Sequence, residues 1–180
     1  LFGLVEEFIL PFVLDHARSG LGQGDERTRA LLSFAGEEAK HIALFKRFSA
    51  AFVRGFGTPC GTVGPSSAVA DKVLSHAPLG VALAILHIEW ITQRHYLESV
   101  KRDQVLEPLF KSLLKHHFSE ECQHARLDTL IALELGEALD PPAIEASVDD
   151  YFAITEALDQ LLIVQVELDL ASFERARGRA

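Results

Sequence analysis

The pattern of hydrophobic and polar positions predicts a chain made almost wholly of α-helices. Apolar residues are nearly continuous from residue 1 to about residue 18, and the glycines at 20, 22 and 24 end this run. We expect a buried helix here, bent if at all at Pro11. From Asp25, a suitable N-cap, apolar residues then repeat at helical spacing to about Arg54, which predicts a second helix.

A glycine- and proline-rich segment separates these two helices from the rest of the chain. Residues 55–67 contain four glycines and two prolines. Neither a helix nor a strand tolerates that composition. We therefore expect a long crossover loop, followed by a short helical lead-in over about 68–76.

Three further helical patterns follow, over about 78–100, 108–135 and 143–177. No segment shows a convincing strand pattern. Short, long and short connections between the first four helices are typical of a four-helix bundle with one crossover. We expect an all-α fold with a single domain over 1–180, in which a core bundle of about 1–137 carries an appended C-terminal helix.

Two Glu-x-x-His motifs stand out on the second and fourth helices, Glu38 to His41 and Glu121 to His124. Helical geometry places the Glu and the His of each motif one turn apart on one face. Both faces are otherwise apolar: they include Leu31, Phe34, Phe45 and Phe52 in the first case, and Phe110, Leu114 and Ala125 in the second. A network of surface ion pairs is the alternative, but the apolar neighbours favour pairs that point into the core and hold metal.

The other two core helices each supply a further inward carboxylate. Glu89 lies in a strongly apolar stretch of the third helix. On the first helix either Glu6 or Glu7 fits, and the apolar neighbours of Glu6 favour it weakly. Buried carboxylates cost several kcal/mol unless a cation compensates them. The order Glu, Glu-x-x-His, Glu, Glu-x-x-His over four helices therefore predicts a two-metal carboxylate site in the bundle core.

A third histidine extends the second motif. His117 lies one turn before Glu121 at nearly the same azimuth, giving the string His117-x-x-x-Glu121-x-x-His124. A core histidine bonded to a backbone carbonyl or to Glu121 is the alternative reading of His117. Asp128 lies one turn beyond His124, where it could orient that imidazole, and Tyr96 lies two turns beyond Glu89, where it could border an oxygen or substrate pocket.

In its motifs the chain resembles the ferritin-like di-iron carboxylate superfamily over residues 1–135. The third histidine is similar to that of the p-aminobenzoate N-oxygenase family. The resemblance implies a ferritin-like bundle and seven metal ligands, which are Glu38, His41, Glu89, His117, Glu121 and His124, with Glu6 or Glu7 as the seventh.

The resemblance and the ligand types together indicate a di-iron oxidoreductase. Mixed imidazole and carboxylate ligands suit two Fe ions, with Mn as the second choice, better than structural zinc. We expect an oxidase or oxygenase that uses O₂ and an external electron donor to oxidise a small organic substrate, with an amine nitrogen as one candidate position. The alternatives are a ferritin-like ferroxidase or iron-binding protein, a dimanganese catalase and a helical module without catalysis.

Composition and charge exclude other classes of function. A net charge of −9 argues against binding of DNA or RNA. The longest apolar run is far shorter than the roughly 20 residues that cross a bilayer, so we expect no membrane partner. Two cysteines, Cys60 and Cys122, are too few and too far apart for a disulfide framework or a CxxC motif, which favours a reducing, cytoplasmic setting. The final helix could pack on its own bundle or on a second subunit of a homodimer.

Overall fold

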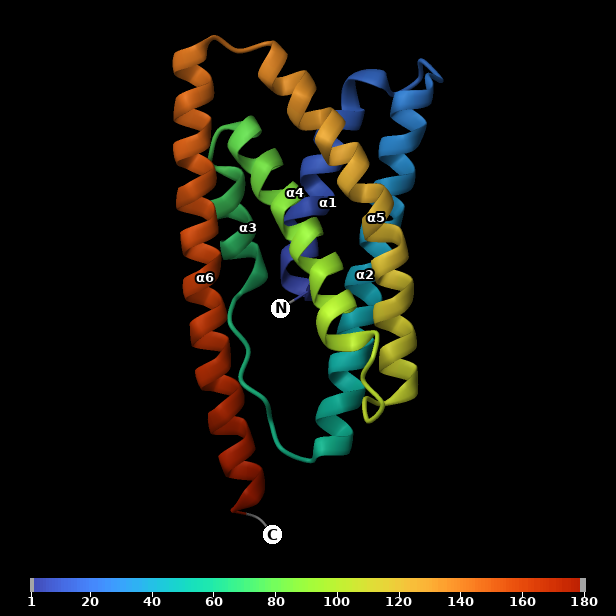
Figure 1. The fold of residues 1–180 in the computed structure, drawn as a ribbon, viewed down its shortest axis with the longest axis vertical. Coiled ribbons are helices and arrows are strands. Elements are labelled where there is room, and N and C mark those ends of the chain that lie inside the picture. Colours follow the sequence, from blue (N-terminus) through green and yellow to red (C-terminus); the bar gives the residue numbers. More distant parts are fainter. Residues whose placement is uncertain (1, 179–180) are drawn as a thin grey trace. The chain divides into compact units, whose positions relative to one another are not determined.

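A computed structural model describes residues 2–178, and it is helical nearly throughout (Figure 1). Its elements are α1 (Phe2–Ala17), a 3₁₀ turn η1 (Arg18–Gly20), α2 (Glu26–Phe56), α3 (Ser66–Leu74), α4 (Pro78–His95), a π-helical turn η2 (Tyr96–Val100), α5 (Pro108–Glu137) and α6 (Pro141–Arg177). No strand occurs between residues 2 and 178. The prediction of an all-α fold is confirmed.

The predicted helix boundaries need one correction of interest. The last helix is predicted to begin near residue 143, but α6 begins two residues earlier, at Pro141. The helix α5 ends at Glu137, two residues beyond its predicted end near 135. Proline fits the first turn of a helix because its missing N–H has no intrahelical acceptor there.

Within residues 2–178, no helix has both the length and the hydrophobicity that are needed to span a membrane. The chain divides into two compact units, which are described separately below. Unit 1 comprises Leu1–Ser75 with Thr155–Ala180, and unit 2 comprises His76–Ile154. The helix α6 contributes to both, because it runs unbroken through the boundary at residue 155. The prediction of one domain over 1–180 stays a prediction.

In unit 1, α1 and α2 pack side by side, and their contacts set the register of the pair. The helix α2 begins at the predicted N-cap, where the Asp25 carboxylate accepts a hydrogen bond from the Thr28 backbone N–H at 2.8 Å. Near the other end of the pair, the rings of Phe2 and Phe45 stack with centroids 5.4 Å apart. Gly3 allows this approach, because a Cβ at that position would lie 3.1 Å from the Cβ of Phe45.

The crossover loop of unit 1 is held by side chains of α6. In Figure 1 this loop leaves the end of α2 and returns to α3, which packs on α1. The buried Gln165 accepts a hydrogen bond from the Val63 backbone N–H at 3.0 Å and donates one to the Gly61 carbonyl at 3.1 Å. Ser172 accepts a bond from the Gly61 N–H at 3.2 Å. A glycine- and proline-rich loop thereby acquires partners for its backbone polar groups.

In unit 2, α4 and α5 pack against each other, and the first part of α6 approaches α4 closely. A Cβ at Gly80 would lie 2.7 Å from the Ser147 carbonyl oxygen, so this crossing requires glycine. The Asp150 carboxylate accepts hydrogen bonds from the Ala77 N–H at 2.9 Å and from His76 at 2.8 Å. These two bonds lower the pKa of Asp150 and satisfy a backbone donor at the start of α4.

Candidate metal centre

Each unit contains one buried cluster of carboxylates and imidazoles, and together the two clusters contain the predicted metal ligands. Unit 1 holds Glu6, Glu38 and His41, and unit 2 holds Glu89, His117, Glu121 and His124. Every one of these side chains is buried. No Lys or Arg is buried in the part of the chain that the structure describes.

The cluster of unit 1 joins α1 and α2 through His41. Its Nδ1 lies 3.8 Å from Glu6 Oε2 and 3.7 Å from Glu38 Oε1. These separations are longer than hydrogen bonds. Two ligand atoms that each lie about 2.1 Å from one metal ion are about 3.0–3.8 Å apart. The cluster therefore has the donor types and the spacing of a metal half-site.

The two candidate carboxylates of α1 point to different partners. Glu6 is buried beside His41, as described above. Glu7 forms an ion pair with Lys46 at 2.6 Å and accepts a hydrogen bond from Ser66, and both bonds lower the pKa of Glu7. Glu7 thus ties α1 to α2 and α3, while Glu6 belongs to the acid–imidazole cluster. That Glu6 binds metal stays a prediction.

Two opposing effects act on the His41 imidazole. Burial favours the neutral ring and lowers its pKa, but the interactions with Glu38 and Glu6 outweigh burial and raise the pKa of His41 to about 11. Without metal, the His41 ring is therefore protonated at neutral pH and acts as the counter-ion of two carboxylates. A metal ion that binds His41 must displace this proton.

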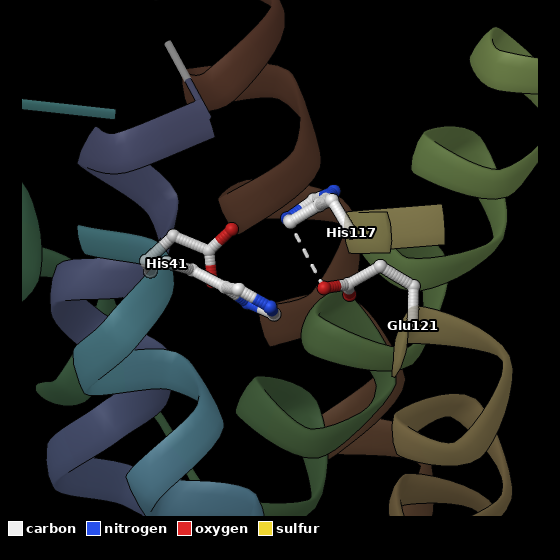
Figure 2. A group of neighbouring side chains, drawn as sticks. His41, His117 and Glu121 are labelled. Carbon is white, nitrogen blue, oxygen red and sulfur yellow. Dashed lines mark ion pairs between the residues drawn. The ribbon is translucent and has the colours of Figure 1, made fainter. Parts of the chain in front are cut away.

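The cluster of unit 2 lies along one face of α5. His117 Nε2 is 3.1 Å from Glu121 Oε1, an interaction that Figure 2 shows as a dashed line. His124 Nδ1 is 3.6 Å from the same oxygen. Glu121 therefore lies between two imidazoles, one turn before it and one turn after it. Both separations again fall in the range expected for atoms that share a metal ion.

Glu89 is fully buried on α4, the helix that packs against α5. One turn further along α4, the Gln93 side chain donates a hydrogen bond to the Glu121 carbonyl at 3.1 Å and accepts a weak one from the Cys122 thiol at 3.5 Å. Burial raises the pKa of the Cys122 thiol, so this residue stays a neutral packing group. Sequence reasoning gave no role to Gln93. The sequence does contain a signal for Gln93, because a residue four positions after Glu89 lies on the same face of the helix.

The two residues with predicted supporting roles are both buried in unit 2. Asp128 is fully buried on α5, one turn beyond His124. Tyr96 opens the π-helical turn, and its ring stacks on Phe118 with centroids 4.6 Å apart. The roles of Asp128 beside a ligating imidazole and of Tyr96 at a pocket stay predictions.

Histidines that were given no role make structural contacts. His16 Nδ1 lies 2.9 Å from the Phe12 carbonyl, and His87 Nδ1 lies 3.1 Å from the Tyr151 hydroxyl. His76 pairs with Asp150, as described above. These contacts are each with a single oxygen, whereas His41 and Glu121 each face two ligand groups. The clusters thus differ from the ordinary histidine contacts of this chain.

Comparison with known proteins adds no relative to this picture. No family model matches the chain, and no curated protein or solved structure matches it significantly.

Proposed function

We propose that this chain is a metal-dependent oxidase or oxygenase that uses two iron ions and O₂ to oxidise a small organic substrate. The observation that carries the proposal is the pair of matching buried clusters. Each has a Glu-x-x-His motif on one helix and a further buried Glu on the helix that packs against it. Manganese is the second choice of metal, since the same ligand types suit it.

Charge supports a cation as the occupant of these clusters. Glu6, Glu38, Glu89, Glu121 and Asp128 are all buried, and the buried cationic partners available in the described residues are imidazoles. Burying an excess of negative charge is expensive unless positive charge compensates it. Two divalent metal ions would supply four positive charges.

The metal ligands in this proposal are the seven residues predicted from sequence, Glu6, Glu38, His41, Glu89, His117, Glu121 and His124. When bound, the iron ions supply redox chemistry with O₂ that amino-acid side chains lack. The side chains hold the ions, and His41 gives up its proton as the metal enters. Gln93 holds the backbone of Glu121 and thereby orients a ligand. The electrons come from an external donor.

The first experiment measures metal bound to the purified chain. We expect mass spectrometry of metals to find two iron ions per chain after anaerobic loading with Fe(II). We also expect a transient visible absorption band when O₂ is added.

Glu38→Gln and Glu121→Gln should each reduce the bound iron, because the variant amide is a poorer and neutral ligand. Glu7→Gln and His116→Ala are matched controls, since these neighbours of ligands lie outside the clusters, and they should bind iron like the parent. Iron no higher in the parent than in the Glu38→Gln variant would contradict the proposal.

Whether His117 binds iron tests the narrower resemblance to the p-aminobenzoate N-oxygenase family. If His117 is a ligand, His117→Ala should remove or shift the band that follows O₂ addition, while His116→Ala leaves the band unchanged. A band that is identical in His117→Ala would make His117 a core histidine bonded to Glu121. Iron stored in large shell-like particles, or rapid disproportionation of peroxide by the manganese-loaded chain, would favour the ferritin-like and catalase alternatives respectively.

A further inference from the structure

One face of α6 is apolar and exposed, and it is distinct from the face that holds the crossover loop. The inner face carries Gln165 and Ser172, which are buried and bonded to that loop. On the outer face, four large apolar side chains follow one another at spacings of three, four and three residues, and each is more than half exposed: Ile163 53%, Val166 57%, Leu170 59% and Phe173 55%. This spacing is that of the contact seam of a coiled coil.

Charged residues continue this seam at both ends with the same spacing. Asp159 lies four residues before Ile163, and Arg177 lies four residues after Phe173, and both are exposed. We define the α6 seam as Asp159, Ile163, Val166, Leu170, Phe173 and Arg177. It has an acid at one end, a base at the other and apolar residues between. All six residues belong to unit 1.

The α6 seam is complementary to itself in the antiparallel direction. If a second α6 lies antiparallel about a two-fold axis between Val166 and Leu170, then Asp159 meets the second copy's Arg177. Ile163 then meets Phe173, and Val166 meets Leu170. Each acid meets a base and each apolar residue meets an apolar residue. A closed two-fold pairing of this kind is the commonest form of oligomer.

From this geometry we infer that the chain forms a two-fold homodimer through antiparallel pairing of the α6 seam. The inference goes beyond the proposed function and does not depend on it. A parallel arrangement would place Asp159 against Asp159 and Arg177 against Arg177, which costs energy. An anionic membrane surface is a poor occupant of this face, because the seam contains the exposed Asp159 and is bordered by the exposed acids Glu167 and Glu174.

Two acidic residues beside the middle of the seam bear on the strength of the dimer. Gln165 donates a hydrogen bond to Asp169 at 2.9 Å, which draws that carboxylate toward the inner face. Glu167 is exposed and lies next to the two-fold axis, so the two copies of Glu167 repel each other. Glu167→Gln should therefore tighten the dimer, because it removes this repulsion.

The test is the molar mass in solution of the full chain over a range of concentrations, by sedimentation equilibrium. We expect a dimer for the parent chain and a monomer for Val166→Glu, with a dissociation constant raised roughly a hundredfold because each copy buries a carboxylate in the seam. Leu130→Glu is the matched control, since Leu130 is 62% exposed on α5, and it should remain a dimer. Circular dichroism of each variant checks that the helices are intact.

Charge reversal tests the direction of pairing. Asp159→Arg and Arg177→Asp should each weaken the dimer, because like charges then meet across the interface. The double variant should restore the affinity of the parent, since the pair is re-formed with its signs exchanged. A parent chain that is monomeric throughout, a dimer that survives Val166→Glu, or a double variant weaker than both single variants would overturn the inference. So would a monomeric parent chain that sediments with anionic lipid vesicles through the same seam.

Discussion

At the scale of single residues, the chain buries carboxylates next to imidazoles. Either group alone would be costly to bury, and each compensates the other when they are buried together. His41 lies between two carboxylates, and Glu121 lies between two imidazoles. The two carboxylates favour the charged form of His41, so proton binding and metal binding at this residue are linked. The protonated His41 ring is the metal-free counterpart of a bound cation.

The metal-free chain should lose stability as the pH rises, because of His41. The pKa of His41 rises from about 6.5 in the unfolded chain to about 11 in the folded one. A raised pKa contributes its full stabilisation below pH 6.5 and loses it progressively as the pH approaches 11, by up to about 1.4 kcal/mol per pH unit. The measurement is the free energy of urea unfolding with a chelator present, at about pH 7 and about pH 9.5.

The His41→Gln variant provides the control for this pH dependence, since a neutral amide binds no proton in either state. Groups outside this cluster titrate alike in both proteins, so the difference between their slopes reports on the cluster of His41, Glu6 and Glu38. Parallel slopes for the parent chain and the variant would show that the pKa of His41 is not raised. An NMR titration of the imidazole would report the same pKa directly.

At the scale of helices, side chains far apart in sequence decide how the elements pack. Gly80 lets α4 approach the backbone of α6, and Gln165 fastens the crossover loop to α6. Gly80 permits the close approach of two helix backbones because it has no side chain. Gln165 satisfies two backbone polar groups of the loop, because its amide accepts one hydrogen bond and donates another. A substitution at either position should therefore lower the free energy of unfolding by more than the small change in side-chain size suggests.

Gly80→Ala should destabilise the protein by about 1–3 kcal/mol. The added Cβ would lie 2.7 Å from the Ser147 carbonyl oxygen and 2.8 Å from the Asp150 Cβ, so the α6 backbone has to shift. Gly36→Ala is the matched control in the interior of α2, where a Cβ meets nothing within 4 Å. It should stabilise the protein by about 0.5–1 kcal/mol, because alanine loses less conformational entropy in a helix. Urea unfolding of both variants checks the opposite signs.

Gln165→Leu should destabilise the protein by about 1–3 kcal/mol, because the Val63 N–H loses its acceptor beside α6. The leucine keeps most of the side-chain volume, so the loss reports on hydrogen bonds. Gln160→Leu, at an exposed position of the same helix, should change the free energy of unfolding by less than about 0.5 kcal/mol. Equal effects of the two substitutions would mean that Gln165 does not hold the loop. Hydrogen exchange at Val63 is the more local readout.

At the scale of the whole molecule, the chain is all-helical and divides into two compact units, each with its own acid–imidazole cluster. Under the proposed function, metal ions bind the folded chain and not the unfolded one. Such binding stabilises the fold by mass action. The two clusters therefore provide a measurable connection between metal binding and global stability.

Adding Mn(II), which avoids oxidation by air, should raise the midpoint of thermal unfolding in the parent chain. At a free metal concentration 100 times the dissociation constant the gain is about 2.7 kcal/mol for each bound ion. A chelator should reverse the shift. Glu38→Gln in unit 1 and Glu121→Gln in unit 2 should each diminish it, whereas His116→Ala should not. An equal shift in all four proteins would place the metal elsewhere.

The sequence by itself determined the helices and the faces on which their chemistry lies. Hydrophobic periodicity, the Asp25 cap and the glycine- and proline-rich breaks are local signals, so the all-α class and the crossover loop could be read directly. The phase of each Glu-x-x-His motif within its helix likewise predicted that Glu38, His41, Glu121 and His124 are buried. These predictions succeeded because a helix converts sequence spacing into direction without help from distant residues.

The tertiary structure decided which groups meet, because meeting depends on the register between helices. It placed Glu6 beside His41 and turned Glu7 to Lys46 and Ser66, although the two acids are neighbours in sequence. It made Pro141 the start of a helix and gave Gln93 and Gln165 partners 28 and 102 residues away. It also assigned one face of α6 to the crossover loop and left the other exposed. Periodicity shows that a face is apolar, but only packing determines what covers it.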